Sequence, residues 1–96
     1  MSNARKVLTA LAGEYSFAVY GYGEVESDII TANVDAAMEH IESQDETEVH
    51  LYHMGALFPS GTINIVGEEG DFTVFDFSAN YNSELWNLLD SLVRED

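Results

Sequence analysis

Hydrophobic and polar residues alternate through the middle of the chain in a pattern that predicts three strands joined by two turns. The extended stretches are EVHLYHMGALF at 48–58, TINIVG at 62–67 and DFTVFDF at 71–77. The intervening PSG and EEG segments, 59–61 and 68–70, contain the proline and glycines that favour tight turns. The pattern therefore predicts a three-stranded antiparallel meander.

A second extended region precedes this meander. Residues 16–31, SFAVYGYGEVESDIIT, are rich in β-branched and aromatic side chains, and Gly21 and Gly23 are expected to divide them into two pieces. The second piece would begin at GEVESD, residues 23–28. Side chains alternate along an extended segment, so the carboxylates should share one outer face and Val25 should point inward. These carboxylates are Glu24, Glu26 and Asp28.

Three other segments have the apolar spacing of amphipathic helices. Ser2, Asn33 and Asn82 are expected to cap them, and Gly13 is placed to end the first. Their predicted buried stripes are Val7, Leu8 and Leu11; Val34, Ala37, Met38 and Ile41; and Leu85, Leu88, Leu89 and Leu92.

These elements predict the α+β class, with residues 1–96 forming a single domain. Helices should cover one face of a largely antiparallel sheet of four or five strands. The other face is left for solvent or a partner, and its candidate aromatic residues are Tyr20, Tyr22 and Tyr52. Packing on the sheet and contact with a partner are both open for these tyrosines, whereas Trp86 is expected to anchor the last helix in the core.

The charge of the chain is strongly one-sided. Eighteen acidic residues oppose three cations, Arg5, Lys6 and Arg94, which gives a net charge of −15, and residues 7–93 contain no lysine or arginine. A hydrophobic fraction of 46% argues against disorder. Such a field excludes nucleic acid and anionic membranes as direct partners and favours basic proteins or cations. No apolar stretch approaches the roughly 18 residues of a membrane span, so we expect a cytoplasmic protein.

The acidic residues form two regular rows. One is the predicted strand face of Glu24, Glu26 and Asp28, where alternate residues lie about 6.6 Å apart. The other is Asp35, Glu39 and Glu42, which follow one another on a helix face about 5 to 6 Å apart. Both spacings are comparable to those of successive phosphates along a nucleic-acid strand.

Motifs for catalysis or cofactor binding are lacking. There is no cysteine, no GxSxG elbow and no phosphate loop, and GEEGD lacks the ligand ladder of a calcium-binding loop. His50 and His53 have an odd spacing that sends them to opposite faces of a strand. Acidic residues are so numerous that close carboxylate pairs carry no information about catalysis. We expect no enzyme activity, no metal site and no cofactor.

In size, charge and lack of catalytic motifs the whole chain resembles the small acidic inhibitors that phages encode against host defence nucleases. These are the anti-CRISPR and anti-restriction proteins, several of which are DNA mimics. The resemblance implies binding to a basic, nucleic-acid-binding protein or nuclease complex in the host cytoplasm. The candidate contact residues are Glu24, Glu26, Asp28, Asp35, Glu39, Glu42, Tyr20 and Tyr22. An immunity protein against a nuclease toxin and a haloadapted interaction domain are the alternatives.

Overall fold

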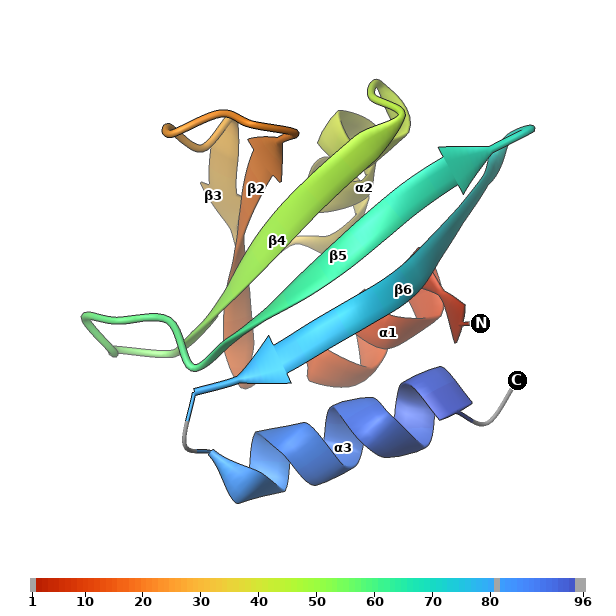
Figure 1. The fold of residues 1–96 in the computed structure, drawn as a ribbon. Coiled ribbons are helices and arrows are strands. Elements are labelled where there is room, and N and C mark those ends of the chain that lie inside the picture. The colour runs from red at the N-terminus through yellow and green to blue at the C-terminus, as the bar shows by residue number, and fades with distance from the viewer. Residues whose placement is uncertain (1, 81, 95–96) are drawn as a thin grey trace.

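The protein is described by a computed structural model that covers residues 2–80 and 82–94. One antiparallel sheet runs through it in the order β1-β6-β5-β4-β2-β3 (Figure 1). Its strands are β1 Ser2–Asn3, β2 Tyr15–Gly21, β3 Ile29–Thr31, β4 Glu46–His53, β5 Gly61–Glu68 and β6 Asp71–Ala79. The helices are α1 Ala4–Leu11, α2 Val34–Glu42 and α3 Ser83–Arg94. The α+β class is confirmed, with five longer strands and the two-residue β1 as a sixth.

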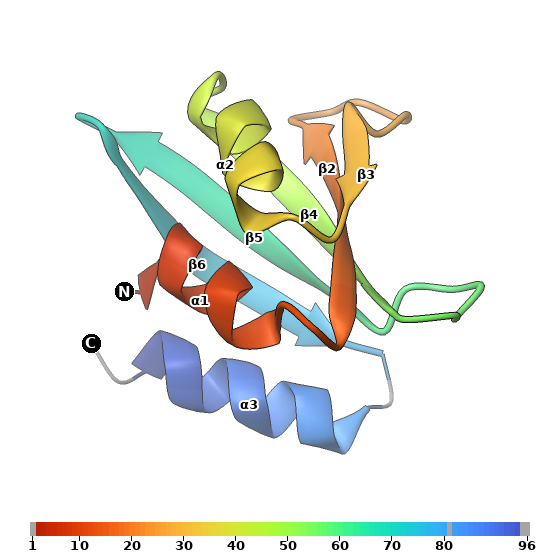
Figure 2. The same ribbon diagram turned by 180° about the vertical axis from the view of Figure 1, so that it is seen from behind.

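The helices lie on one face of the sheet, as expected (Figures 1 and 2). Alternate residues of the central strands point toward them and form the core with the buried stripes of α1 and α2. The strand residues of this core include Phe17, Val19, Val49, Leu51, Ile63 and Ile65. The face without helices is called the open face, and it carries Ser16, Ala18, Tyr20, Glu46, Glu48, His50, Tyr52, Thr62, Asn64 and Val66.

The predicted helix caps are right for two helices and wrong for one. The side-chain oxygen of Asn33 accepts a hydrogen bond from the Ala36 N–H at 2.9 Å, and that of Asn82 accepts one from the Leu85 N–H at 3.0 Å. The cap of α1 is Asn3, because Ser2 pairs with Val74 in β1 instead. A neighbouring residue thus takes the role expected of Ser2.

The meander of β4, β5 and β6 is confirmed, and its two turns differ. Glu69 and Gly70 have φ values of 51° and 87°, the positive pair typical of a two-residue hairpin turn. The first connection is longer than predicted, because β4 ends at His53 and residues 54–60 form a loop. Gly55 has a φ of 85°, which a regular strand does not accommodate, so the expected strand to Phe58 is wrong.

GEVESD is not an extended strand. Residues 22–28 form the loop between β2 and β3, in which the Glu24 N–H donates to the Gly21 carbonyl at 3.0 Å. The loop closes where the Asp28 N–H donates to the Val19 carbonyl at 2.7 Å. Val25 is 93% exposed, so the prediction that it points inward is wrong. The three carboxylates therefore do not share a strand face.

Helix α3 buries a narrower stripe than its leucines predict. Leu85 and Leu89 are in the core and Leu92 packs partly against it, whereas Leu88 is 38% exposed. Trp86 is also exposed, with its ring centroid 5.8 Å from that of Phe77. The predicted burial of Leu88 and the predicted core position of Trp86 are both wrong. The reason is that α3 packs along β6 and only one narrow face of the helix is buried.

Candidate acidic binding surface

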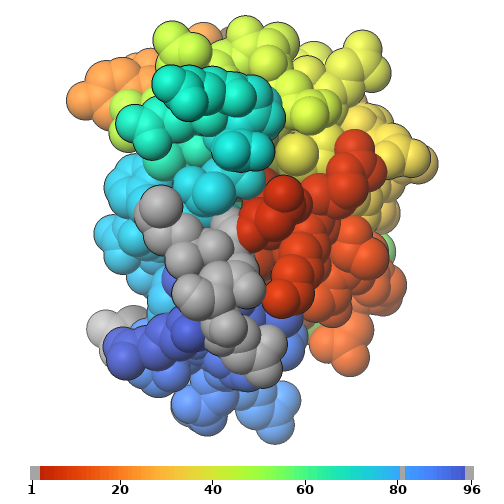
Figure 3. All heavy atoms as spheres, turned by 90° about the vertical axis from the view of Figure 1, so that its right-hand side faces the viewer, coloured from red at the N-terminus to blue at the C-terminus, as the bar shows by residue number. Residues whose placement is uncertain are grey.

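Ten carboxylates gather at one end of the sheet. In this antiparallel sheet, β2 and β5 end where β4 and β6 begin, so the β2–β3 loop, the α2–β4 connection and the β5–β6 turn lie at the same end (Figure 1). The space-filling view shows the α2–β4 and β5–β6 connections side by side (Figure 3). We call this the acidic end, comprising Glu24, Glu26, Asp28, Glu42, Asp45, Glu46, Glu48, Glu68, Glu69 and Asp71.

Hydrogen bonds join the α2–β4 connection to the β2–β3 loop and to strand β5. The side-chain amide of Gln44 donates to Asp28 Oδ2 at 2.9 Å and to the His40 carbonyl at 3.2 Å, which joins the β2–β3 loop to the end of α2. The Gly67 N–H donates to the Asp45 carbonyl at 2.7 Å, which joins the same connection to β5. The carboxylates are thus carried on linked segments of backbone.

Two of the three cationic side chains are paired with carboxylates outside this end. Arg5 pairs with Asp35 at the start of α2, and Arg94 pairs with Asp90 within α3. Lys6, the remaining cation, lies on α1, and residues 7–93 contain no lysine or arginine. The negative potential of the acidic end is therefore not neutralised by cationic side chains from its own segments.

The Asp28 carboxylate lies close enough to Glu24 to change the pKa of Glu24. The pKa of Glu24 is raised above its ordinary value, chiefly by repulsion from the Asp28 carboxylate, then by desolvation and by a hydrogen bond with Asp28. A hydrogen bond between two carboxyl groups needs a proton on one of them, so this pair favours holding a proton. The loop places two of the three predicted acids together, although not by strand alternation.

The predicted helix row is separate from the acidic end over most of its length. Asp35, Glu39 and Glu42 are all exposed on α2, which lies on the helical side of the sheet. Asp35 is paired with Arg5, and only Glu42 reaches the acidic end. The two predicted rows therefore do not form one continuous surface.

Tyrosines line the open face, as the sequence predicts. The ring of Tyr20 lies 4.4 Å from that of His50, between centroids, and His50 Nε2 lies 3.2 Å from Glu48 Oε2. Tyr52 on β4 is the cross-strand partner of Ser16 on β2, and both lie on the open face. Tyr22 follows the end of β2 and is 79% exposed, which leaves its ring available for contact.

No protein-family model, curated protein or solved structure matches the chain. Within residues 2–80 and 82–94, no three His, Asp or Glu side chains are grouped to hold a metal ion. No helix in those ranges is long and apolar enough to cross a membrane. His50 and His53 do lie on opposite faces, and the His53 ring meets Tyr15 edge-on at 5.4 Å.

Several residues of this surface escaped the sequence-based prediction. Glu46 and Glu48 alternate on β4 with Thr47, Val49 and Leu51, and this alternation could have identified them as open-face acids. No alternation of this kind in the sequence identifies Phe75 as part of the surface. It is the extra residue of a β-bulge, since Asn64 pairs with Asp76 and Ile65 pairs with Val74.

The charge of the acidic end should make stability fall as pH rises. The pKa of Glu24 is higher in the folded state than in the unfolded state. Its contribution to the stability of the fold is therefore fully present below the unfolded pKa and is lost as pH rises through the folded pKa. Repulsion among the charged carboxylates of the acidic end is screened by salt. Thermal melts from pH 5 to 8 at two salt concentrations should show higher melting temperatures in mild acid and in added salt. A melting temperature that rises with pH at low salt contradicts this.

Proposed function

We propose that the protein is an acidic inhibitor that binds a basic, nucleic-acid-binding protein or nuclease complex and blocks its DNA or RNA site by charge mimicry. The observation that carries the proposal is the acidic end, where ten carboxylates lie on three connections and on the ends of the helix and strands that they join. The protein would act in the manner of the anti-CRISPR and anti-restriction inhibitors, in the cytoplasm of the host cell if it is phage-encoded.

Electrostatics supports this choice of partner. Proteins that bind nucleic acid neutralise phosphates with lysine and arginine, so their binding grooves are positive. The acidic end presents the opposite sign, without lysine or arginine on its own segments. The same sign opposes direct contact with nucleic acid or with an anionic membrane. The interaction requires no cofactor and no catalysis.

A capture experiment with a competition step tests the proposal. The tagged protein is incubated with a host lysate at low salt, and retained proteins are eluted first with excess duplex DNA or RNA and then with rising salt. We expect at least one nucleic-acid-binding protein to be released by the nucleic acid, because both ligands would occupy the same basic groove. Activity of the released protein on its nucleic acid should then fall when the acidic protein is added back.

Two results would count against the proposal. One is that captured proteins leave with salt but are indifferent to excess nucleic acid, which would place the contact outside a nucleic-acid site. The other is loss of far-ultraviolet circular dichroism at low salt. That loss is expected of a haloadapted domain, whose acidic surface depends on a salty medium, and not of an inhibitor that folds in an ordinary cytoplasm.

A further inference from the structure

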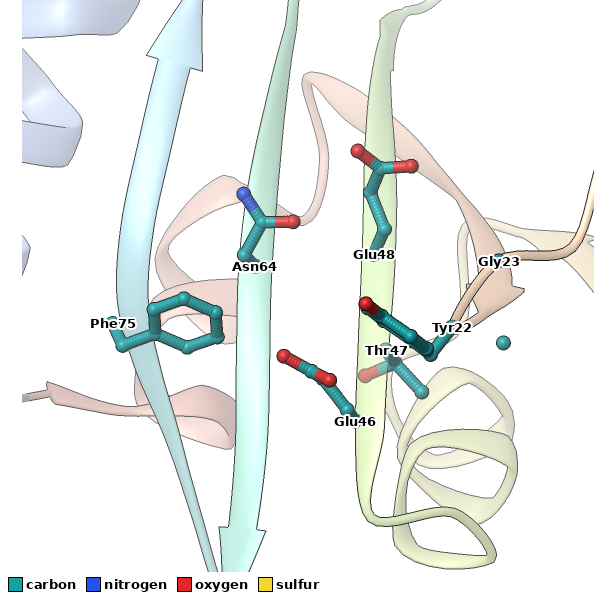
Figure 4. A pocket seen from close by; sticks show the side chains of 8 residues that line it. Tyr22, Gly23, Glu46, Thr47, Glu48, Asn64 and Phe75 are labelled. Atoms are coloured by element: carbon teal, nitrogen blue, oxygen red, sulfur yellow. The ribbon is translucent and has the colours of Figure 1, made fainter.

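A hollow of about 350 Å³ lies on the open face beside the acidic end. Its lining residues are Gly21, Tyr22, Gly23, Glu46, Thr47, Glu48, Asn64 and Phe75. In Figure 4, Tyr22 reaches over β4 from one side and Phe75 reaches toward β5 from the other; the Glu46 carboxylate lies between their rings, and Asn64 and Glu48 follow on β5 and β4. The volume is near the lower end of the range of about 300 to 1,000 Å³ found for ligand pockets, so a small group fits it.

The two walls of this hollow are aromatic and accessible. Tyr22 is 79% exposed and Phe75 is 47% exposed, and each is a large side chain left out of the core. Phe75 has this position because the β-bulge removes it from pairing with β5. Aromatic faces attract cations through their quadrupole and stack on flat groups.

The polar residues that line this hollow offer hydrogen-bond acceptors. Glu46 and Glu48 are alternate residues of β4 and so point to the same side of the sheet. Asn64 is the cross-strand partner of Glu48 and adds an amide oxygen. His50 Nε2 lies 3.2 Å from Glu48 Oε2. Among the described residues, none that lines the hollow is a lysine or an arginine.

We infer that this hollow binds a single arginine side chain of the basic partner, and the inference rests on the proposed function. A guanidinium group is planar, always charged and weakly hydrated, so it stacks on aromatic rings while its edges donate to carboxylates. The ammonium of lysine is a compact, strongly hydrated point charge that satisfies only part of this arrangement. Aromatic walls with carboxylates in the same hollow therefore favour arginine over lysine.

The test uses short peptides in place of the unidentified partner. The ¹⁵N-labelled protein is titrated at low salt with an end-blocked Gly-Arg-Gly peptide, with its lysine counterpart, and with a citrulline counterpart that keeps the shape of arginine without its charge. We expect saturable amide shifts at Tyr22, Glu48 and Phe75 with the arginine peptide. Binding of the lysine peptide should be weaker by about threefold, and the citrulline peptide should give no saturable shifts.

Two variants and a control assign the binding to this hollow. Tyr22→Ala removes one wall without changing the charge and should weaken arginine binding by about two- to fivefold. Glu48→Gln should weaken binding of both cationic peptides. Leu57→Ala removes an exposed apolar residue in the β4–β5 loop at the other end of the sheet and should change nothing. The amide spectrum of each variant reports whether its fold is kept.

Equal binding of the arginine and lysine peptides, or shifts spread over the β2–β3 and β5–β6 connections, would overturn the inference, because diffuse attraction to the acidic end produces both. The same holds if Tyr22→Ala leaves the arginine affinity unchanged. Either result leaves the capture experiment unaffected, since a partner can bind the acidic end without placing an arginine in the hollow. Conversely, arginine binding without any captured partner would contradict only the proposed function.

Discussion

Replacing Leu89 by alanine is expected to lower the free energy of unfolding by about 2 to 5 kcal/mol, the range for a fully enclosed leucine. Leu89 has no exposed surface and belongs to the core between α3 and the sheet. Its truncation removes apolar burial and leaves a cavity that the surrounding strands and helices fill only in part. Urea denaturation followed by far-ultraviolet circular dichroism measures the loss.

Leu88→Ala is the matched control for this substitution. It makes the same chemical change one residue earlier in the same helix, at a side chain that is 38% exposed. Part of its surface is already in water, so we expect a cost below about 1 kcal/mol. Similar costs for the two variants, or a larger cost for Leu88→Ala, would mean that α3 is rotated from the orientation described above.

Features that depend on local physics could be predicted from the sequence. The stripe Ala37, Met38 and Ile41 follows helical periodicity, and the Asn33 cap needs only the first turn of its own helix. The Glu69-Gly70 turn joins two alternating segments directly, so its type and position follow from a short stretch. In each of these cases the information lies within about ten neighbouring residues.

Features that depend on distant partners could not be predicted. The interval 22–28 contains alternating carboxylates that suit a strand, but β3 pairs with β2 only over Ile29–Thr31 and the preceding residues stay outside the sheet. The rotation of α3 about its axis determines that Leu89 is buried and Leu88 is partly exposed. Contacts between α3 and β6 set this rotation. The hollow is formed jointly by the end of β2, by β4 and by the β-bulge at Phe75. The sequence of any one of these segments therefore does not predict it.

The triple variant Glu24→Gln, Glu26→Gln and Asp28→Asn is expected to weaken binding to the captured target on the order of tenfold at low salt, because it removes three exposed charges that attract a basic groove. The change takes the net charge from −15 to −12, since three carboxylates become neutral amides. Asparagine at position 28 keeps an oxygen that can accept the hydrogen bond from Gln44. The loss should appear mainly as a slower association rate, measured by surface plasmon resonance at several salt concentrations.

Binding and stability should move in opposite directions in this variant. Removing the repulsion between positions 24 and 28 relieves a cost of the folded state, so the melting temperature should stay the same or rise. The comparison variant Asp35→Asn, Glu39→Gln and Glu42→Gln makes an equal change of charge on α2, where Arg5 already pairs with Asp35 and only Glu42 reaches the acidic end. A smaller loss of binding in the comparison variant would assign the contact to the β2–β3 loop, and equal losses would point to net charge alone. Unchanged affinity and unchanged salt dependence in the loop variant would mean that these three carboxylates only face solvent, and the partner would then have to bind elsewhere.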